Sequence, residues 1–444
     1  MRVVNLFDIV ARASNHRWLF KMDTMNEKTP KRASSLINLF LPGIFLLGFN
    51  IGTGSVTSMA KAGATYGMSL LWAVLLSCVA TYFMIVLYGR YTLITGETAL
   101  QAFRKHLHPA VGLFFIVALT AGVSGSVMGV MGIVADMSSQ WSKTFIDGGI
   151  APIYFALFFI SMVYFIFWNG QTKFFERALA VIVAVMAACF ILNFFILMPP
   201  AVDIAKGLIP SIPEVAAKET RGPFLLIASM VGTTLFSGLF IIRTTLVKEA
   251  GWTLKDDQQQ RRDAKVAVTL MFIISASIMA AAAGTLFAEG IGLSKATQMI
   301  GLLEPLAGPM AASIFAIGII AAGVSSQFPN VLMLPWLLCD YNNSKREMTL
   351  TKYRVMVFFI SLLGLVVPIF EARPLLVMIV SQAFNSVILP ATVACIFILG
   401  NKTKVMGEHK HSAATNAILL AIFAFSIITS IMGINGVLAM LSNL

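Results

Sequence analysis

Charged residues are scarce in this sequence. Only 12% of the 444 residues are Asp, Glu, Lys or Arg, whereas 58% are hydrophobic, and the mean hydropathy is +0.85. A soluble globule needs more polar side chains than this to coat its surface. The composition therefore excludes an ordinary soluble domain and indicates an integral membrane protein.

Cysteine pairs and enzyme motifs are also lacking. Four cysteines fall within or at the edges of apolar stretches and predict no disulfide framework: Cys78, Cys189, Cys339 and Cys395. The sequence holds no phosphate-binding Gly-x-x-x-x-Gly-Lys motif, no Gly-x-Ser-x-Gly motif and no paired Cys or His ligand set. We therefore predict that the protein is not an enzyme, and that it has neither a cofactor nor a resident metal.

Long apolar runs, by contrast, are abundant. About 18 apolar residues in helical form cross the roughly 30 Å of a bilayer's hydrocarbon. Eleven stretches qualify as predicted spans: 36–61, 67–89, 109–138, 151–168, 175–199, 223–247, 266–288, 306–338, 355–370, 374–399 and 413–440.

The distribution of the basic residues behind the net charge of +12 indicates how the chain is threaded through the membrane. If the amino terminus is cytoplasmic, the inner segments hold 24 Lys and Arg and the outer segments hold seven, with Arg243 left inside a span. Such a bias follows the positive-inside rule, so no nucleic-acid partner is implied. We expect a multi-pass protein of a plasma (inner) membrane, with the amino terminus in the cytoplasm and the carboxyl terminus outside. Its partners are the bilayer and a small substrate, and its oligomeric state is open, a monomer being compatible with the sequence.

Two predicted spans are interrupted by small residues. The first contains "GFNIGTGSVTS" (48–58), and the sixth contains "SMVGTTLFSGLFIIRTTLV" (229–247). Paired breaks at matching positions of two halves are typical of transporters built from inverted repeats. Irregular backbone at bilayer depth needs protein or a polar cavity around it, so we expect the two breaks to face each other around a substrate.

The run "LPGIFLLGFNIGTGSVTSMAKAGATYGMSLLWAVLLS" (41–77) resembles the start of the Nramp family of divalent metal transporters. Similar echoes are "YTLITGETALQAFRKH", "DAKVAVTLMFIISASI", "FAIGIIAAGVSSQ" and "LLVMIVSQAFNSVILP", so that the resemblance covers about residues 38 to 400. It implies an all-α membrane protein with the LeuT-type fold, two inverted five-helix repeats and alternating access. The implied organisation is a cytoplasmic amphipathic or disordered amino terminus (1–35), a first repeat (36–199), a second repeat (200–400) and an eleventh helix with its preceding loop (401–444).

The residues that carry metal chemistry in that family are replaced here. Its Asp-Pro-Gly-Asn motif falls on Gly52, Thr53, Gly54 and Ser55, and its Met-Pro-His motif falls on Phe236, Ser237 and Gly238. An acidic pair that the family associates with proton movement falls on Leu119 and Gly122, and a glutamine of its tenth helix on Ile388. The replacements predict weak or absent proton coupling.

The candidate substrate site consists of neutral groups. We expect the following residues to bind the substrate: Gly52, Thr53, Gly54, Ser55, Thr233, Phe236, Ser237 and Gly238. A second set is expected to line the pathway or to act in gating: Asn50, Thr57, Thr234, Arg243, Ser325, Gln382 and Asn385. For Arg243 two interpretations stay open, one in which it attracts an anion or acts in gating and one in which it reaches the headgroups or pairs with Asp263 or Glu97.

These residues favour a small inorganic ion as the substrate. A dehydrated divalent cation prefers carboxylate ligands, which the breaks lack. Helix amino termini and hydroxyl groups instead suit an oxyanion, so the ligands favour a small anion such as bicarbonate. A divalent metal cation (Mn²⁺, Fe²⁺ or hydrated Mg²⁺) is the alternative, and a small amino-acid-like solute is the second.

Overall fold

All regular secondary structure in the described residues is helical. The computed structural model describes residues 52–169, 172–197, 199–214, 223–307 and 310–442. The first half contains α3 (Thr53–Tyr66), α4 (Leu71–Thr95), α5 (Ala99–Ala102), η1 (Phe103–Leu107), α6 (Pro109–Ser142), α7 (Pro152–Asn169), α8 (Thr172–Leu197) and α9 (Ala201–Gly207). The second half contains α10 (Phe224–Thr234), α11 (Ser237–Glu249), η2 (Leu254–Asp256), α12 (Asp257–Ala282), η3 (Ala283–Phe287), η4 (Ala296–Leu303), α13 (Glu304–Ala307) and α14 (Ala311–Tyr341). The chain continues through α15 (Thr351–Leu362), η6 (Leu363–Leu365), α16 (Val366–Ile369), α17 (Pro374–Asn401), α18 (Thr403–Met406), η7 (Gly407–His409) and α19 (Ala413–Leu441).

Nine helices within the described ranges are long and apolar enough to cross a membrane. The predicted fifth span corresponds to α8, a helix of 26 residues that is not among these nine. The first span is described only from Gly52 onward, so its amino-terminal half, Asn50 and the 1–35 segment lie outside the described residues. The count of eleven spans therefore stays a prediction.

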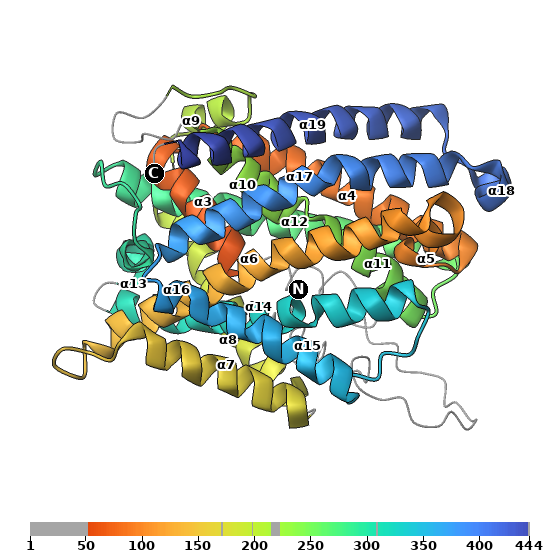
Figure 1. The fold of residues 1–444 in the computed structure, drawn as a ribbon. Coiled ribbons are helices and arrows are strands. Elements are labelled where there is room, and N and C mark those ends of the chain that lie inside the picture. The colour runs from red at the N-terminus through yellow and green to blue at the C-terminus, as the bar shows by residue number, and fades with distance from the viewer. Residues whose placement is uncertain (1–51, 170–171, 198, 215–222, 308–309, 443–444) are drawn as a thin grey trace, which may run out of the picture.

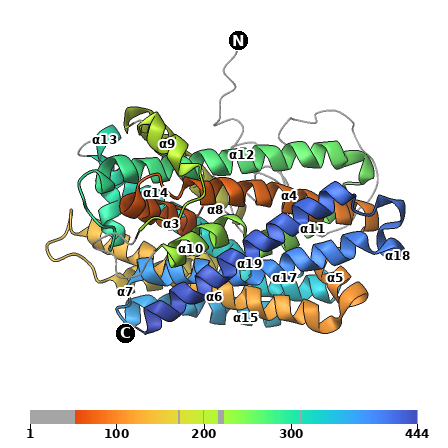
Figure 2. The same ribbon diagram turned by 90° about the horizontal axis from the view of Figure 1, so that it is seen from above.

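The long helices run side by side, and the connecting segments gather at the two ends of the bundle (Figures 1 and 2). Figure 1 shows α5 and α18 together at one end, and α9 and α13 at the other. The first of these ends holds the segments predicted to face the cytoplasm. Two hydrogen bonds connect the segments there. Lys402 Nζ donates to the carbonyl of His106, and Lys248 Nζ donates to Gln101 Oε1 at 3.1 Å.

The sixth span is divided into two helices as the sequence predicts. α10 ends at Thr234, and α11 begins at Ser237 after Phe236, which has extended dihedral angles (φ −81°, ψ 121°). A break inside a membrane leaves backbone groups that need new partners. The Thr81 hydroxyl of α4 supplies one of them by donating to the Thr234 carbonyl at 3.0 Å. The break is thus stabilised by a neighbouring span.

The core of the bundle brings α6 against α14 and α17, and α10 against α17. Close approach of α6 to α17 depends on small residues, as membrane helices commonly require. A Cβ atom placed on Gly129 of α6 would lie 2.9 Å from the Cα of Met378, so even alanine is tight there. This packing places polar side chains of α6 and α17 beside the two broken helices.

Candidate functional site

A polar cavity of about 50 Å³ lies where the start of α3 and the break between α10 and α11 meet α6, α14 and α17. Its volume accommodates roughly three to five waters, since one water needs about 10–15 Å³ by the same measure. Twelve residues line it: Gly52, Gly54, Ser55, Val123, Ser126, Val130, Thr233, Phe236, Ser326, Asn330, Gln382 and Asn385. The cavity therefore joins residues from both halves of the sequence, as expected for facing breaks.

The start of α3 forms one wall of this cavity. Gly52 is extended (φ −112°, ψ −170°) and no side chain caps the helix, whose first backbone N–H groups carry the positive end of the helix dipole. The Ser55 hydroxyl turns back and donates to the Gly52 carbonyl at 3.1 Å. A Cβ atom on Gly52 would lie 2.2 Å from Ser326 Oγ, so glycine lets α3 begin directly against α14.

The carboxyl end of α10 forms another wall. Thr233 lies in its last turn, where backbone carbonyls carry the negative end of the helix dipole. Phe236 contributes an apolar ring, and a Cβ atom on Gly238 would lie 2.5 Å from that ring. The cavity thus lies between the positive end of one helix dipole and the negative end of another, each of which carries only a partial charge.

A chain of hydrogen bonds connects α17 to α6 at the third wall. Asn385 Nδ2 donates to Gln382 Oε1 at 3.3 Å, and Gln382 Nε2 lies 3.5 Å from Ser126 Oγ. Ser126 and Ser381 hydroxyls lie 3.0 Å apart, and both lie within hydrogen-bonding distance of the Gly122 carbonyl. The amide groups are therefore held in a defined orientation.

The lining is chemically neutral. Its polar atoms belong to hydroxyls, amides and peptide groups, and none of the twelve lining residues is Asp, Glu, His, Cys or Met. Among the described residues no group of three or more His, Cys, Asp or Glu side chains is placed to hold a metal ion. A fully dehydrated divalent ion would find no charged ligand at this site.

Only some of the residues predicted from the sequence line the cavity. Seven of them line the cavity: Gly52, Gly54, Ser55, Thr233, Phe236, Gln382 and Asn385. Another seven lie outside its lining: Thr53, Thr57, Thr234, Ser237, Gly238, Arg243 and Ser325. Several of these support the helix break, because Thr392 Oγ1 donates to Ser237 Oγ at 2.7 Å and Thr234 Oγ1 donates to the Met230 carbonyl at 2.8 Å.

Arg243 is buried in an ion pair instead of facing the cavity. Its Nη1 lies 2.6 Å from Asp263 Oδ2, and both side chains are completely buried. The guanidinium also lies over the ring of Trp252, 5.4 Å from its centroid. Of the partners that the sequence allowed, Asp263 is the one in contact, so the charge of Arg243 is neutralised between α11 and α12.

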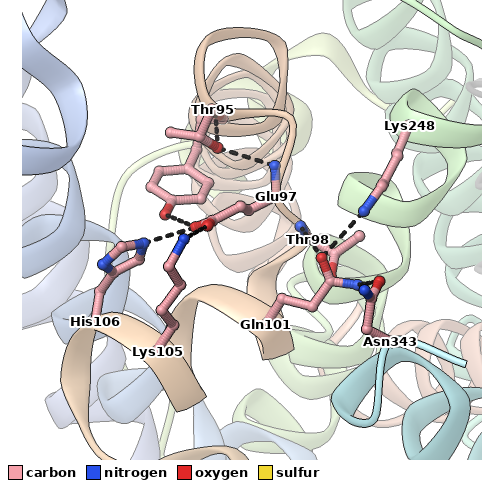
Figure 3. Close-up of polar contacts among 9 residues, drawn as sticks. Thr95, Glu97, Thr98, Gln101, Lys105, His106, Lys248 and Asn343 are labelled. Carbon is pink, nitrogen blue, oxygen red and sulfur yellow. Dashed lines mark hydrogen bonds and ion pairs between the residues drawn. The ribbon is translucent and has the colours of Figure 1, made fainter.

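Glu97 belongs to a separate polar network at the end of the bundle that holds α5 (Figure 3). Burial alone would raise the pKa of its carboxyl, but hydrogen bonds from Lys105 and His106 outweigh this effect and lower the pKa below its usual value. Nearby, Gln101 Nε2 donates to Asn343 Oδ1 at 3.0 Å (Figure 3). The contact of Gln101 with Asn343 connects α5 to the loop after α14.

Among the polar lining residues, Ser326 lies next to the predicted Ser325, whereas two others were missed in the sequence. Ser126 lies in the small-residue run "AGVSGSVMG" of α6, and Asn330 follows a proline within α14. Small polar residues within a span usually form helix contacts, so neither position stands out without knowledge of which face meets the breaks. The proline before Asn330 was the one available signal.

Known proteins resemble this chain along most of its length. The sequence model described as "Natural resistance-associated macrophage protein-like" (Nramp) matches residues 44–435. The chain is 26% identical over 421 residues to the divalent metal cation transporter MntH of Yersinia enterocolitica, covering 92% of this chain and 97% of that protein. It is 23% identical over 426 residues to MntH of Klebsiella pneumoniae, covering 92% and 98%.

Solved structures show the same fold. The manganese transporter of Eremococcus coleocola, crystallised with an aromatic bis-isothiourea substituted compound, superposes with a TM-score of 0.69 at 14% identity, covering 91% of this chain and 88% of that one. The inward-facing conformation of Mhp1 gives a TM-score of 0.57 at 14% identity, covering 90% and 88%. The predicted LeuT-type fold is confirmed by these likenesses.

Proposed function

This chain belongs to the Nramp family of membrane transporters, and from that premise we propose that it carries a divalent metal cation that retains part of its water shell. The observation that carries the proposal is the neutral, oxygen-rich cavity between the broken helices. Hydroxyl and amide groups hydrogen-bond to metal-bound water, and the last turn of α10 presents the negative end of its dipole. Mg²⁺ fits this description best, because it gives up its waters reluctantly and binds through few direct ligands.

The similar proteins favour a divalent cation as the substrate, whereas the neutral residues of the site, taken alone, favoured a small anion. Two of them are named divalent metal cation transporters, and a similar structure is that of a manganese transporter. Mn²⁺ and Fe²⁺ gain more than Mg²⁺ does from nitrogen and sulfur ligands, and the cavity lining offers neither thioether nor imidazole. We therefore place hydrated Mg²⁺ ahead of the softer transition metals.

A small anion such as bicarbonate is the second candidate. It is favoured by the start of α3, where uncapped backbone N–H groups border the cavity and no carboxylate repels an oxyanion. Arg243 gives this candidate no support, because its charge is used by Asp263. The amino-acid-like solute is the third candidate, and no contact in the cavity favours it specifically.

We further propose that the protein works in a plasma membrane, with its amino terminus and the Glu97 network on the cytoplasmic side. Proton coupling is expected to be weak or absent, because Leu119 and Gly122 stand where the family resemblance places an acidic pair. Both residues are buried in α6 and neither titrates.

Proteoliposome uptake tests the proposal. Purified protein is reconstituted, and the uptake of Mg²⁺, Mn²⁺ and labelled bicarbonate is measured in parallel against empty vesicles. We expect saturable Mg²⁺ uptake with a millimolar KM and little Mn²⁺ uptake at micromolar concentration. Saturable bicarbonate uptake without divalent cation uptake would move the second candidate to first place.

A designed variant tests the ligand argument itself. Ser55→Asp places a carboxylate at the cavity, whereas Ser55→Asn has the same size without the charge. We expect the aspartate variant to bind Mn²⁺ measurably by calorimetry and the asparagine variant to behave like the parent. Equal Mn²⁺ binding by all three proteins would contradict the claim that missing charge sets the selectivity.

A further inference from the structure

We propose that Asn330 of α14 binds the substrate, and that its amide oxygen accepts hydrogen bonds from the waters of the bound cation. This inference rests on the proposed function and adds a specificity-determining residue to it. The residue lies on α14, so it belongs to neither of the helices whose breaks were expected to hold the substrate.

Most polar side chains of the cavity lining already have a hydrogen-bond partner within the protein. Three hydroxyls donate to backbone carbonyls and two amides pair with each other: Ser55 with Gly52, Ser126 with Gly122, Ser326 with Ala322, and Asn385 with Gln382. A hydroxyl has only one hydrogen to donate, and an amide with one engaged end is held in one orientation. These five side chains are therefore committed to the wall of the cavity.

Asn330 and Thr233 are the two polar lining side chains without such a partner. Neither side chain makes a hydrogen bond to another residue that the structure describes. Both residues keep some exposed surface, 9% for Asn330 and 5% for Thr233, and none of their side-chain polar atoms is among the fully buried, unpartnered atoms of the described chain. Their polar groups thus stay accessible at the cavity. Thr233 was expected to bind the substrate from the sequence, whereas Asn330 was not.

Asn330 lies one helical turn beyond Ser326, on the same face of α14, because residues four apart on a helix lie one above the other. Ser326 borders the start of α3, since a Cβ atom on Gly52 would lie 2.2 Å from its Oγ. From Asn330 the helix continues to Tyr341, whose carbonyl accepts from Arg104 Nη1 at 3.1 Å at the end of the bundle that holds α5. Asn330 therefore lies on the side of the cavity nearer to that end, which is the proposed cytoplasmic side.

The chemistry of a free amide suits a cation that keeps part of its water shell. Its oxygen is a hard, neutral acceptor of the kind that binds Mg²⁺ directly or through water. No internal hydrogen bond fixes which end of the Asn330 amide faces the cavity, so the oxygen is able to turn toward cation-bound water. The amide nitrogen would serve an oxyanion in the same way. A change of charge at this position therefore distinguishes a cation from an anion.

The test measures KM and kcat for Mg²⁺ uptake in proteoliposomes. Asn330→Leu removes the amide at similar volume and is expected to raise KM about fivefold or more, while kcat changes less than about threefold. Asn330→Asp keeps the shape and adds a negative charge, so it is expected to lower KM for Mg²⁺ about tenfold, because a hard cation prefers a carboxylate. Thr233→Val removes the other free group and is expected to raise KM severalfold.

Asn342→Leu is the matched control. It makes the same exchange near the end of the same helix, twelve residues or about 18 Å away, where the exposed Asn342 amide donates to the Leu338 carbonyl. We expect its KM to stay within about twofold of the parent. Ser326→Ala removes a lining hydroxyl that is already engaged, so its KM should rise less than that of Asn330→Leu. Should the leucine variant not be recovered as a monodisperse protein, Asn330→Ala removes the amide without added volume and gives the same readout.

The results separate the inference from the proposed function. An unchanged KM in Asn330→Leu, with the parent transporting Mg²⁺, would overturn the inference and leave the proposed function intact. An equal rise in Asn342→Leu or in Ser326→Ala would also overturn it, because the effect would then not depend on a free amide at the cavity. Uptake of bicarbonate instead of a divalent cation by the parent, abolished in Asn330→Asp, would remove the proposed function and the acceptor role together.

Discussion

Asp263→Asn tests the account of Arg243 as an internal partner of Asp263. The substitution keeps the shape of the side chain and removes its charge, which leaves a fully buried guanidinium without compensation. Removing one member of a buried ion pair costs about 3–5 kcal/mol. At about 1.4 kcal/mol per tenfold change, the unfolded fraction should rise roughly a hundredfold to a few thousandfold.

The matched control replaces both members of the pair with apolar residues. Arg243→Met together with Asp263→Leu leaves no buried charge, and such exchanges are often neutral or stabilising. We therefore expect the double variant to regain most of the stability that Asp263→Asn loses. Unfolding of the detergent-solubilised proteins, followed by tryptophan fluorescence against denaturant, measures both effects.

Transport by the double variant decides the functional part of the argument. If Arg243 only joins α11 to α12, the double variant should transport the substrate with a KM within about twofold of the parent. If Arg243 attracts an anionic substrate, uptake should be lost although the protein folds. A stable double variant without transport would refute our interpretation of this residue.

Two further predictions concern positions away from the cavity. Gly400→Ala should destabilise the protein by about 1–3 kcal/mol, because its Cβ atom would lie 2.0–2.5 Å from ring atoms of the buried His411. The control Gly292→Ala, whose Cβ atom meets nothing within 4 Å, should unfold like the parent in the same denaturant titration. Glu97 has a pKa lowered from 4.5, so its contribution to stability is present above pH 4.5 and is lost as the pH falls through the lower folded value. Glu97→Gln should remove that part of the acid dependence, and an unchanged acid profile of unfolding would contradict the role of its two basic partners.

The sequence was informative wherever a physical constraint acts over a whole span. The lengths of the apolar runs predicted most of the long helices, and the small residues around Ser237 predicted where the sixth span departs from helix, whereas those around Gly52 coincide with the start of α3. These features follow from the bilayer, which penalises free backbone groups and rewards continuous apolar helices.

Details that depend on the relative rotation of helices were beyond the sequence. Ser126 and Asn330 join the cavity only because α6 and α14 turn those faces toward the breaks. Asp263, twenty residues along the chain, becomes the partner of Arg243 because α11 and α12 both pack against α4, which brings the two side chains within reach of each other. Side-chain periodicity alone does not fix such rotations in helices that are apolar on every side.

Calorimetric titration of the purified protein with Mg²⁺ and Mn²⁺ tests the central claim most directly. The claim is that neutral groups in the cavity hold a cation through its water shell and offer no direct charged or soft ligand. The account predicts weak, millimolar binding of Mg²⁺ and no tighter binding of Mn²⁺. Micromolar Mn²⁺ binding that is lost in Asn330→Leu would contradict it, because such affinity requires a dehydrated metal in this cavity.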